Sequence, residues 1–222
     1  MSRPRCVVAD IQSLAAAAKE AGALVVIDAV SSLGAVPCET DAWGLDVVVS
    51  GSQKGMSTPP GLSFASVSPA AWERSRETGT PRFYFDWKRT LDAQNGGGSP
   101  FTPATATVNA LDVALDRVLD EGLEAIWERT RGLAGRFRAR VLASGLELYS
   151  PDDESCSLVT AVQVPEGADA NELRRAVLAA GYIIEGGRGR TAGKVLRFGH
   201  LGATDEGALN AGFDALLAAL PA

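Results

Sequence analysis

The chain has 222 residues, of which 46% are hydrophobic, and its 27 acidic and 21 basic side chains give a net charge of −6. This acidic balance argues against a nucleic-acid-binding protein, because neutralising phosphates requires clustered lysine and arginine. The three widely spaced cysteines (Cys6, Cys38 and Cys156) and the single histidine form neither a disulfide framework nor a zinc-ligand pattern, so we expect no metal and a reducing, cytoplasmic setting. We also expect no membrane-spanning segment and no signal peptide, since no apolar run is long enough.

The first half of the chain alternates helix and strand patterns. The elements predicted here are an alanine-rich helix over 8–21 and continuous apolar strands at 23–27, 47–49 and 62–67. Strands that are apolar throughout, rather than at every second residue, are typical of a sheet covered on both faces. The pattern therefore predicts an α/β fold with a mainly parallel sheet and flanking helices, whose sites lie at the carboxyl ends of the strands.

The second half has a different organisation. Residues 82–89 form a basic and aromatic run that we interpret as packing or the wall of a site, and 94–103 form a glycine- and proline-rich loop. The elements predicted after this loop are a long helical stretch over 105–144, interrupted near Gly122, strands at 158–164, 182–185 and 195–198, a helix capped by Asp169 that ends at Gly181, and a last helix carrying Leu209 and Phe213. We divide the chain at 1–104, 105–144 (connecting helices) and 145–222 (a smaller α+β domain).

Two charged side chains follow buried strands. Asp28 ends the first strand, and Lys54 lies in the loop of Val47-Val-Val-Ser-Gly-Ser-Gln-Lys-Gly55. A lysine amine can form a Schiff base with an aldehyde, and a carboxylate can hold a proton on a ring nitrogen. Pyridoxal phosphate requires both roles. Spacing alone nevertheless favours a simple salt bridge, or two solvated loop residues.

Nearly the whole chain carries motifs that occur together in one known family. The core of the match is VVIDAVSSLGAVPCETDAWGLDVVVSGSQKGMSTPPGLSFASVS, extended by FYFDWKR, GSPFTPAT and GKVLRFGHLG. These motifs resemble the class V, fold-type I pyridoxal-phosphate aminotransferases, in particular the alanine–glyoxylate and serine–glyoxylate (serine–pyruvate) family. The resemblance implies a homodimer in which 1–104 is a remnant of the large cofactor-binding domain. It also implies ping-pong transamination between a small amino acid, alanine or serine, and a small 2-oxo acid, glyoxylate or pyruvate.

The resemblance also implies a role for each of five cofactor-binding residues. Lys54 forms the covalent link to the cofactor and then shuttles the substrate proton, while Asp28 pairs with the pyridinium nitrogen. Val30 packs on one face of the ring. Gln53 contacts the phosphate, and Thr102 reaches the phosphate of the neighbouring subunit's cofactor.

Four further residues in the C-terminal part of the chain have expected roles or positions. The resemblance implies that Arg197 grips the substrate carboxylate, for which a planar guanidinium is well suited; from the residues alone, a strand-end arginine paired with a local acid is an equal alternative. Arg188 and Arg190 are interpreted as loop residues near the site entrance. His200 is interpreted as a satisfied core or rim histidine.

The chain also departs from the family pattern. Relatives carry a stretch ahead of Val7 that supplies a phosphate-binding turn, an aromatic residue over the ring and a hydroxyl near the ring oxygen, and Ser99 stands where some have tyrosine. We therefore expect a fragment, a truncated gene model or a degenerate copy with exposed sheet edges. The alternatives are a non-catalytic remnant that only dimerises, or a related lyase, desulfurase or phosphonate transaminase. For a desulfurase Cys156 is the candidate, although Gln53 stands where that enzyme has histidine.

Overall fold

The computed structural model describes residues 8–150 and 157–221. They form two structural units, each described by itself: the first contains 11–30 and 39–117, and the second contains 8–10, 31–38 and the described residues from 118 onward. Cys6 and Cys156, and with Cys156 the cysteine of the desulfurase alternative, lie outside the described residues. The division at 104 and 144 stays a prediction.

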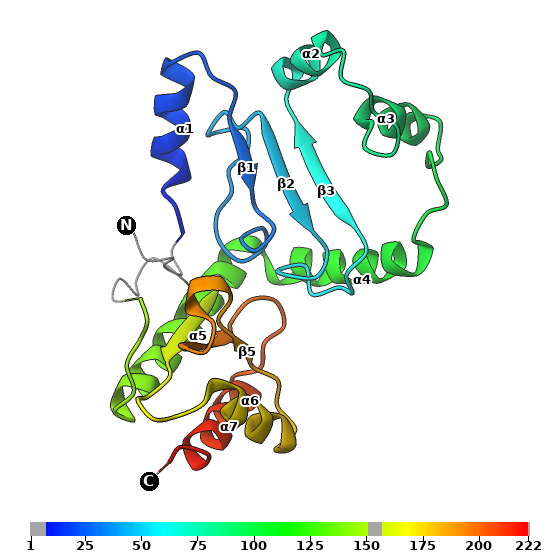
Figure 1. Ribbon diagram of the computed structural model, residues 1–222. Helices are drawn as coiled ribbons and strands as arrows, with labels where there is room; N and C mark the ends of the chain where they lie inside the picture. The colour runs from blue at the N-terminus through cyan, green and yellow to red at the C-terminus, as the bar shows by residue number, and fades with distance from the viewer. Residues whose placement is uncertain (1–7, 151–156, 222) are drawn as a thin grey trace. The chain divides into compact units, whose positions relative to one another are not determined.

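The first unit contains a small sheet, one helix before it and three helices after it in the chain (Figure 1). Its elements are α1 (Ile11–Glu20), β1 (Val26–Asp28), β2 (Val47–Gly51), β3 (Ser63–Val67), α2 (Pro69–Glu77), α3 (Trp87–Asn95) and most of α4 (Thr105–Glu121). The predicted first helix and three strands are thus confirmed with different bounds: α1 and β3 are shorter than predicted, β2 is longer, and β1 lies closer to Asp28. Helices α2 and α3 were not predicted. Helix α3 begins where the side chain of Asp86 accepts hydrogen bonds from the backbone amides of Lys88 and Arg89.

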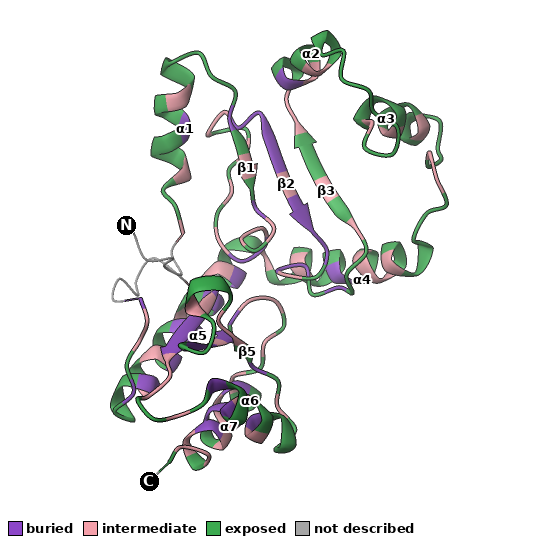
Figure 2. Ribbon diagram, in the orientation of Figure 1, coloured by how far each residue is buried: buried purple, intermediate pink, exposed green. Residues whose placement is uncertain are grey.

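The three strands lie in the order β1-β2-β3, with β2 in the middle (Figure 1). Strands β1 and β2 run parallel, with Asp28 opposite Val49. Strand β3 runs antiparallel to β2, since the connection over 52–62 contains no crossover helix. The expected burial of all three strands is wrong for β1 and β3: only β2 is buried along most of its length (Figure 2).

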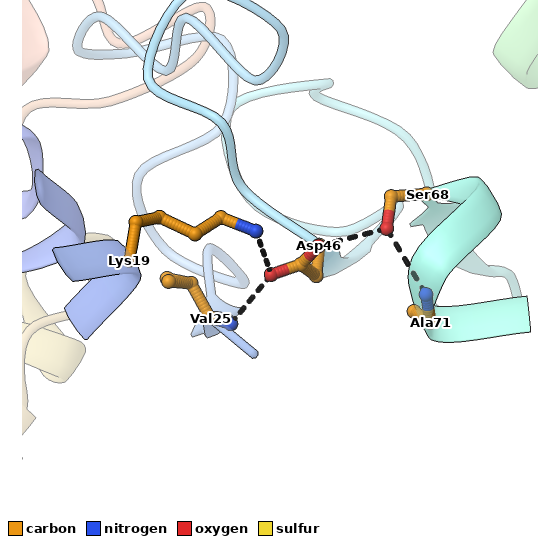
Figure 3. Close-up of polar contacts among 5 residues, drawn as sticks. All are labelled: Lys19, Val25, Asp46, Ser68 and Ala71. Carbon is orange, nitrogen blue, oxygen red and sulfur yellow. Dashed lines mark hydrogen bonds and ion pairs between the residues drawn. The ribbon is translucent and has the colours of Figure 1, made fainter. Parts of the chain in front are cut away.

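A buried carboxylate, Asp46, lies directly before β2 and joins several elements of the first unit. Asp46 is 2% exposed and accepts hydrogen bonds from Lys19 Nζ (2.5 Å), Val25 N (2.8 Å) and Ser68 Oγ (2.9 Å), as Figure 3 shows. Ser68 in turn accepts from Ala71 N and so caps α2. Burial raises the pKa of Asp46, but the hydrogen bonds from Lys19, Val25 and Ser68 outweigh it and hold the pKa below its usual value.

We expect Asp46→Ala to lower the free energy of unfolding of the first unit by about 2–4 kcal/mol, because it leaves the Val25 amide without its acceptor and removes a charge-assisted contact. Urea unfolding followed by tryptophan fluorescence measures the change. The control is Asp112→Ala on the exposed surface of α4, expected to stay within about 0.5 kcal/mol of the wild type. Equal values for the two variants would show that the Asp46 contacts do not hold the unit together.

The second unit is an antiparallel sheet packed against helices. Its elements are α5 (Leu123–Ala143), β4 (Val159–Gln163), α6 (Ala170–Ala179), β5 (Glu185–Gly186), the 3-10 turn η2 (Gly189–Thr191), β6 (Val195–Gly199) and α7 (Glu206–Ala218). The strand order is β4-β6-β5. Phe137, Phe198 and Phe213 form the centre of the core, with ring centroids 4.9–5.9 Å apart. Across the described residues, no helix combines the length and the apolar character needed to cross a membrane.

Most of the predicted boundaries in this half are confirmed. Gly122, with φ +83°, separates α4 from α5, and the Asp169 side chain accepts from the amides of Asn171 and Glu172 at the start of α6. The predicted strand at 182–185 is wrong over most of its length. Tyr182 N donates to Val177 O and so helps to end α6, which leaves only Glu185–Gly186 to pair with β6.

Candidate active site

Asp28 and Lys54 belong to the same edge of the first unit's sheet. Asp28 is the last residue of β1, and Lys54 lies three residues beyond Gly51, the last residue of the parallel strand β2. Two hydrogen bonds join the strands directly after Asp28: Ala29 N donates to Val49 O (2.8 Å), and Ser50 Oγ donates to Ala29 O (3.1 Å). The sheet therefore fixes the backbone that carries Asp28 against the backbone that leads to Lys54.

The carboxylate of Asp28 is exposed and only partly engaged. Its Oδ1 accepts a hydrogen bond from the backbone amide of Val30 (2.9 Å), which orients the group, and Val30 itself is half-buried. Among the described residues, no ion pair joins Asp28 to Lys54. The simple salt bridge that spacing alone favoured is therefore not what these residues form.

The loop that carries Lys54 is closed at its base by backbone and hydroxyl groups. Ser52 O accepts from both Thr58 N (3.1 Å) and Thr58 Oγ1 (2.6 Å). Ser52 Oγ donates to Pro59 O (2.7 Å) and accepts from Leu62 N (3.3 Å). Ser52 and Thr58 are 0% and 7% exposed, so this network is shielded from water.

Lys54 lies at the open end of the loop, in a tight turn. Lys54 O accepts from Ser57 N (2.9 Å), and Lys54 is half-buried, with no hydrogen bond or ion pair from its amine to another described residue. Ser57 has φ +54°, the one positive φ of a non-glycine residue in the described part of the chain. Such a conformation costs on the order of 1 kcal/mol and persists where its surroundings impose it, frequently at functional sites.

Gln53, the predicted phosphate contact, lies exposed next to Lys54. Its side chain folds back over Gly51: a Cβ at residue 51 would lie 2.8 Å from Gln53 Oε1. The absence of a side chain at Gly51 therefore leaves room for the Gln53 amide at the end of β2.

Thr102 is exposed and lines a cavity of about 400 Å³ in the first unit, together with Ser99 and aromatic side chains from β3 and the 82–89 run. Phe101 is the centre of this cluster, with its ring centroid 5.8 Å from Phe83 and 4.8 Å from Tyr84. The guanidinium of Arg89 lies 4.6 Å from the Phe83 centroid. The run therefore packs against Phe101 and lines this cavity, so the packing interpretation is confirmed, and a role as the wall of a site stays a prediction.

Arg197 lies in the second unit, in the middle of β6. Its Nε donates to Gly186 O (2.8 Å), and its Nη2 lies 3.8 Å from a carboxylate oxygen of Glu185. This is the arginine–acid pairing that the residues alone allowed, but an ion pair of this length with an exposed carboxylate stabilises little. Arg188 and Arg190 are exposed beside and within η2, and their role stays a prediction.

His200 follows β6 and is 0% exposed. Its Nε2 lies 2.7 Å from Thr160 Oγ1, and its ring packs 5.3 Å from that of Phe137. The expected core position is confirmed. The expectation that the ring nitrogens are hydrogen-bonded is wrong for Nδ1, which has no partner among the described residues. Burial, with a smaller effect of the Arg138 charge, lowers the pKa of His200 to about 4.

Sequence reasoning missed the network around the lysine. Ser50, Ser52 and Thr58 were not singled out, although the stretch SGSQKGMST places hydroxyl side chains on both sides of Lys54, directly after the apolar run. A hydroxyl residue next to a strand end often bonds to the local backbone, which is the signal that was available.

The chain is similar to known proteins both in sequence and in fold. Residues 6–199 match the family model of class V aminotransferases. The chain is 40% identical to the small subunit of a soluble hydrogenase from Synechococcus sp. (strain PCC 6716), over 96% of this chain and 56% of that protein. It is 41% identical to an L-aspartate–glyoxylate aminotransferase from Paracoccus denitrificans, over 85% of this chain and 48% of that protein.

The fold matches solved aminotransferases. An alanine–glyoxylate aminotransferase from Nostoc sp. superposes with a TM-score of 0.91 at 29% identity, over 97% of this chain and 58% of that one. The chain therefore belongs to the class V aminotransferase family and has its fold-type I α/β architecture, as the sequence predicted. It spans about half the length of the curated relatives it matches.

Proposed function

We propose that this protein is a pyridoxal-phosphate-dependent aminotransferase that transfers an amino group from a small amino acid, alanine or serine, to a small 2-oxo acid, glyoxylate or pyruvate. One observation carries the proposal: in a class V family member, the carboxylate of Asp28 and the amine of Lys54 follow the adjacent parallel strands β1 and β2 at one edge of the sheet, and the described residues offer this amine no partner. Glyoxylate as acceptor is supported by the names of the Paracoccus and Nostoc proteins.

The donor set at this edge fits the cofactor. Lys54 offers a primary amine for an aldehyde, Asp28 a carboxylate for a protonated ring nitrogen, and Gln53 amide hydrogens for a phosphate, while Val30 offers an apolar surface. When bound, pyridoxal phosphate supplies the aldehyde that takes up the amino group and the ring that accepts the electrons of the substrate carbon.

The chain's own groups have distinct tasks in this proposal. Lys54 would hold the cofactor through its amine and would carry the proton that leaves the substrate carbon. Asp28, oriented by the Val30 amide, keeps the ring nitrogen protonated. Arg197 binds the substrate carboxylate. Its terminal nitrogen Nη2 is held only by a long contact with Glu185, so it can bind the substrate instead of Glu185.

We further propose a homodimer in a cytoplasmic setting, with a large domain that includes residues up to 104 and a small C-terminal domain. Phe83, Tyr84 and Phe85 are 65–80% exposed beside the cavity that Thr102 lines. Exposed aromatic patches of this kind mark interaction surfaces. A second copy of the chain bound to this face would agree with the proposed role of Thr102 at a neighbouring subunit's phosphate.

The test is to titrate the purified protein with pyridoxal phosphate, reduce it with borohydride and map the adduct by peptide mass spectrometry. We expect an adduct at Lys54 and a visible absorbance band that bleaches on addition of alanine or serine and returns with glyoxylate or pyruvate. Aspartate and 2-aminoethylphosphonate, added in parallel, test other donors. A band that no amino donor bleaches would contradict transamination and favour the non-catalytic alternative; no adduct at Lys54 would contradict cofactor binding as well.

A further inference from the structure

We propose that the hydroxyl groups of Ser52 and Thr58 form a clamp that positions Lys54 for attachment of the cofactor. The inference rests on the proposed function and adds two residues to it. Both lie within four positions of the lysine, and neither is directed at a ligand: every hydrogen bond of their side chains ends on the backbone of the same loop, 52–62.

The hydrogen bonds of the clamp use the bonding capacity of the Ser52 carbonyl and engage the Ser52 hydroxyl as both donor and acceptor. Ser52 O accepts two hydrogen bonds from Thr58, one from the amide and one from the hydroxyl, which occupies both lone pairs of the carbonyl. Ser52 Oγ donates once and accepts once. The two residues are 0% and 7% exposed, so no water can take over these bonds without opening the loop. Residues 52 and 58, which flank the lysine turn, are therefore held together.

The turn between residues 52 and 58 has a strained backbone, which the clamp holds in place. Ser57 has φ +54°, which a serine adopts rarely, and its amide closes the turn onto Lys54 O. A turn of this kind relaxes unless its ends are fixed. Relaxation would turn the Lys54 backbone, and with it the direction of a side chain that no other described residue holds.

A second link ties the clamped loop to the carboxylate. Ser50 is 5% exposed, and its hydroxyl donates to the carbonyl of Ala29, the residue after Asp28. Ser50 and Ser52 are separated by a single residue, Gly51, at the end of β2. The route from Asp28 to Lys54 therefore runs through buried hydrogen bonds up to the lysine turn, and the clamp is its last part.

The test compares Thr58→Val, which removes the hydroxyl and keeps the shape, with Thr58→Ser, which keeps the hydroxyl. The readouts are the pyridoxal-phosphate concentration at which half of Lys54 is trapped by borohydride, and the amide exchange rate of the 53–58 peptide without cofactor. For Thr58→Val we expect about five- to tenfold weaker trapping, the factor for one lost hydrogen bond, and faster exchange. Thr58→Ser should match the wild type.

Two further variants make the result decisive. Ser52→Ala removes the other hydroxyl and should reproduce Thr58→Val; it also serves if the valine variant does not fold. Ser66→Ala, on the exposed face of β3, is the matched control and should change nothing. Folded clamp variants that exchange faster but trap pyridoxal phosphate at Lys54 like the wild type would overturn the inference and leave the proposed function intact. If the wild type itself gives no Lys54 adduct, the proposed function fails and the inference fails with it.

Discussion

Lys54→Ala is expected to abolish covalent cofactor attachment and to lower the rate of transamination by at least about 10²–10⁴-fold, the contribution of one positioned proton-transfer group. The reason is that Lys54 presents an amine three residues beyond β2, in a turn whose flanking residues, Ser52 and Thr58, bond to one another. Its half-buried amine is not bonded to another described residue, so its removal costs little folding energy. The measurements are borohydride trapping, and single-turnover bleaching by alanine.

Three further experiments test whether Lys54 acts through the chemistry of its amine and not through its charge alone. Lys54→Arg keeps the positive charge but offers no nucleophilic amine, since a guanidinium stays protonated, and should be as inactive as the alanine variant. Lys88→Ala removes a lysine whose side chain is 67% exposed and paired with Asp92, and should keep wild-type activity. A small primary amine added to Lys54→Ala should restore part of the proton transfer. Activity in Lys54→Arg equal to the wild type would refute the proposed role.

The part of the site that sequence could predict depends on local patterns. The continuous apolar runs located β1 and β2, and parallel strands end at the same edge of a sheet, so Asp28 and the Lys54 loop were correctly expected together. The family resemblance, carried by the stretch from Val25 to Ser68, then supplied a chemistry that the spacing alone did not favour.

The part that sequence could not predict depends on distant partners. Asp46 precedes an apolar run and resembles a solvated strand start, yet it is buried because Lys19 and Ser68 lie 27 and 22 residues away in the chain and meet it in the fold. The hydroxyl residues on both sides of Lys54 indicate bonds to the local backbone, but the sequence does not say which carbonyls and amides they reach to close the lysine loop. The antiparallel course of β3 follows from a connection without a helix, which the apolar pattern of 62–67 does not reveal.

The exposure of β1 has a different origin. Val26 lies in a continuous apolar run, which is typical of a strand buried on both faces, but it is 67% exposed. Within the described residues, β1 pairs on one side only, with β2. The Nostoc structure that superposes on 97% of this chain contains further protein beyond the matched 58%. The sequence of β1 therefore fits a larger sheet than the described residues provide.

Acidification is expected to destabilise the second unit through His200. Its pKa is lowered from 6.5 to about 4 by burial, so between these values the unfolded chain binds a proton that the folded chain excludes. The stability is therefore complete above about pH 6.5 and falls as the pH drops toward 4, where about 3 kcal/mol has been lost at 1.36 kcal/mol per pH unit.

The molecule offers a clean measurement of this effect, because His200 is its only histidine. Urea unfolding followed by circular dichroism gives the free energy of unfolding from pH 7.5 to pH 4.5, and amide exchange in β4 and β6 assigns the change to the second unit. His200→Gln keeps a polar group for Thr160 without a group that titrates in this range, so its stability should depend less on pH between 6.5 and 4.5. Carboxylates contribute equally to both proteins at each pH, so the difference between the two curves isolates the histidine. Parallel curves would show that His200 is as easily protonated in the folded core as in the unfolded chain. Water would then reach Nδ1, the ring nitrogen without a described partner.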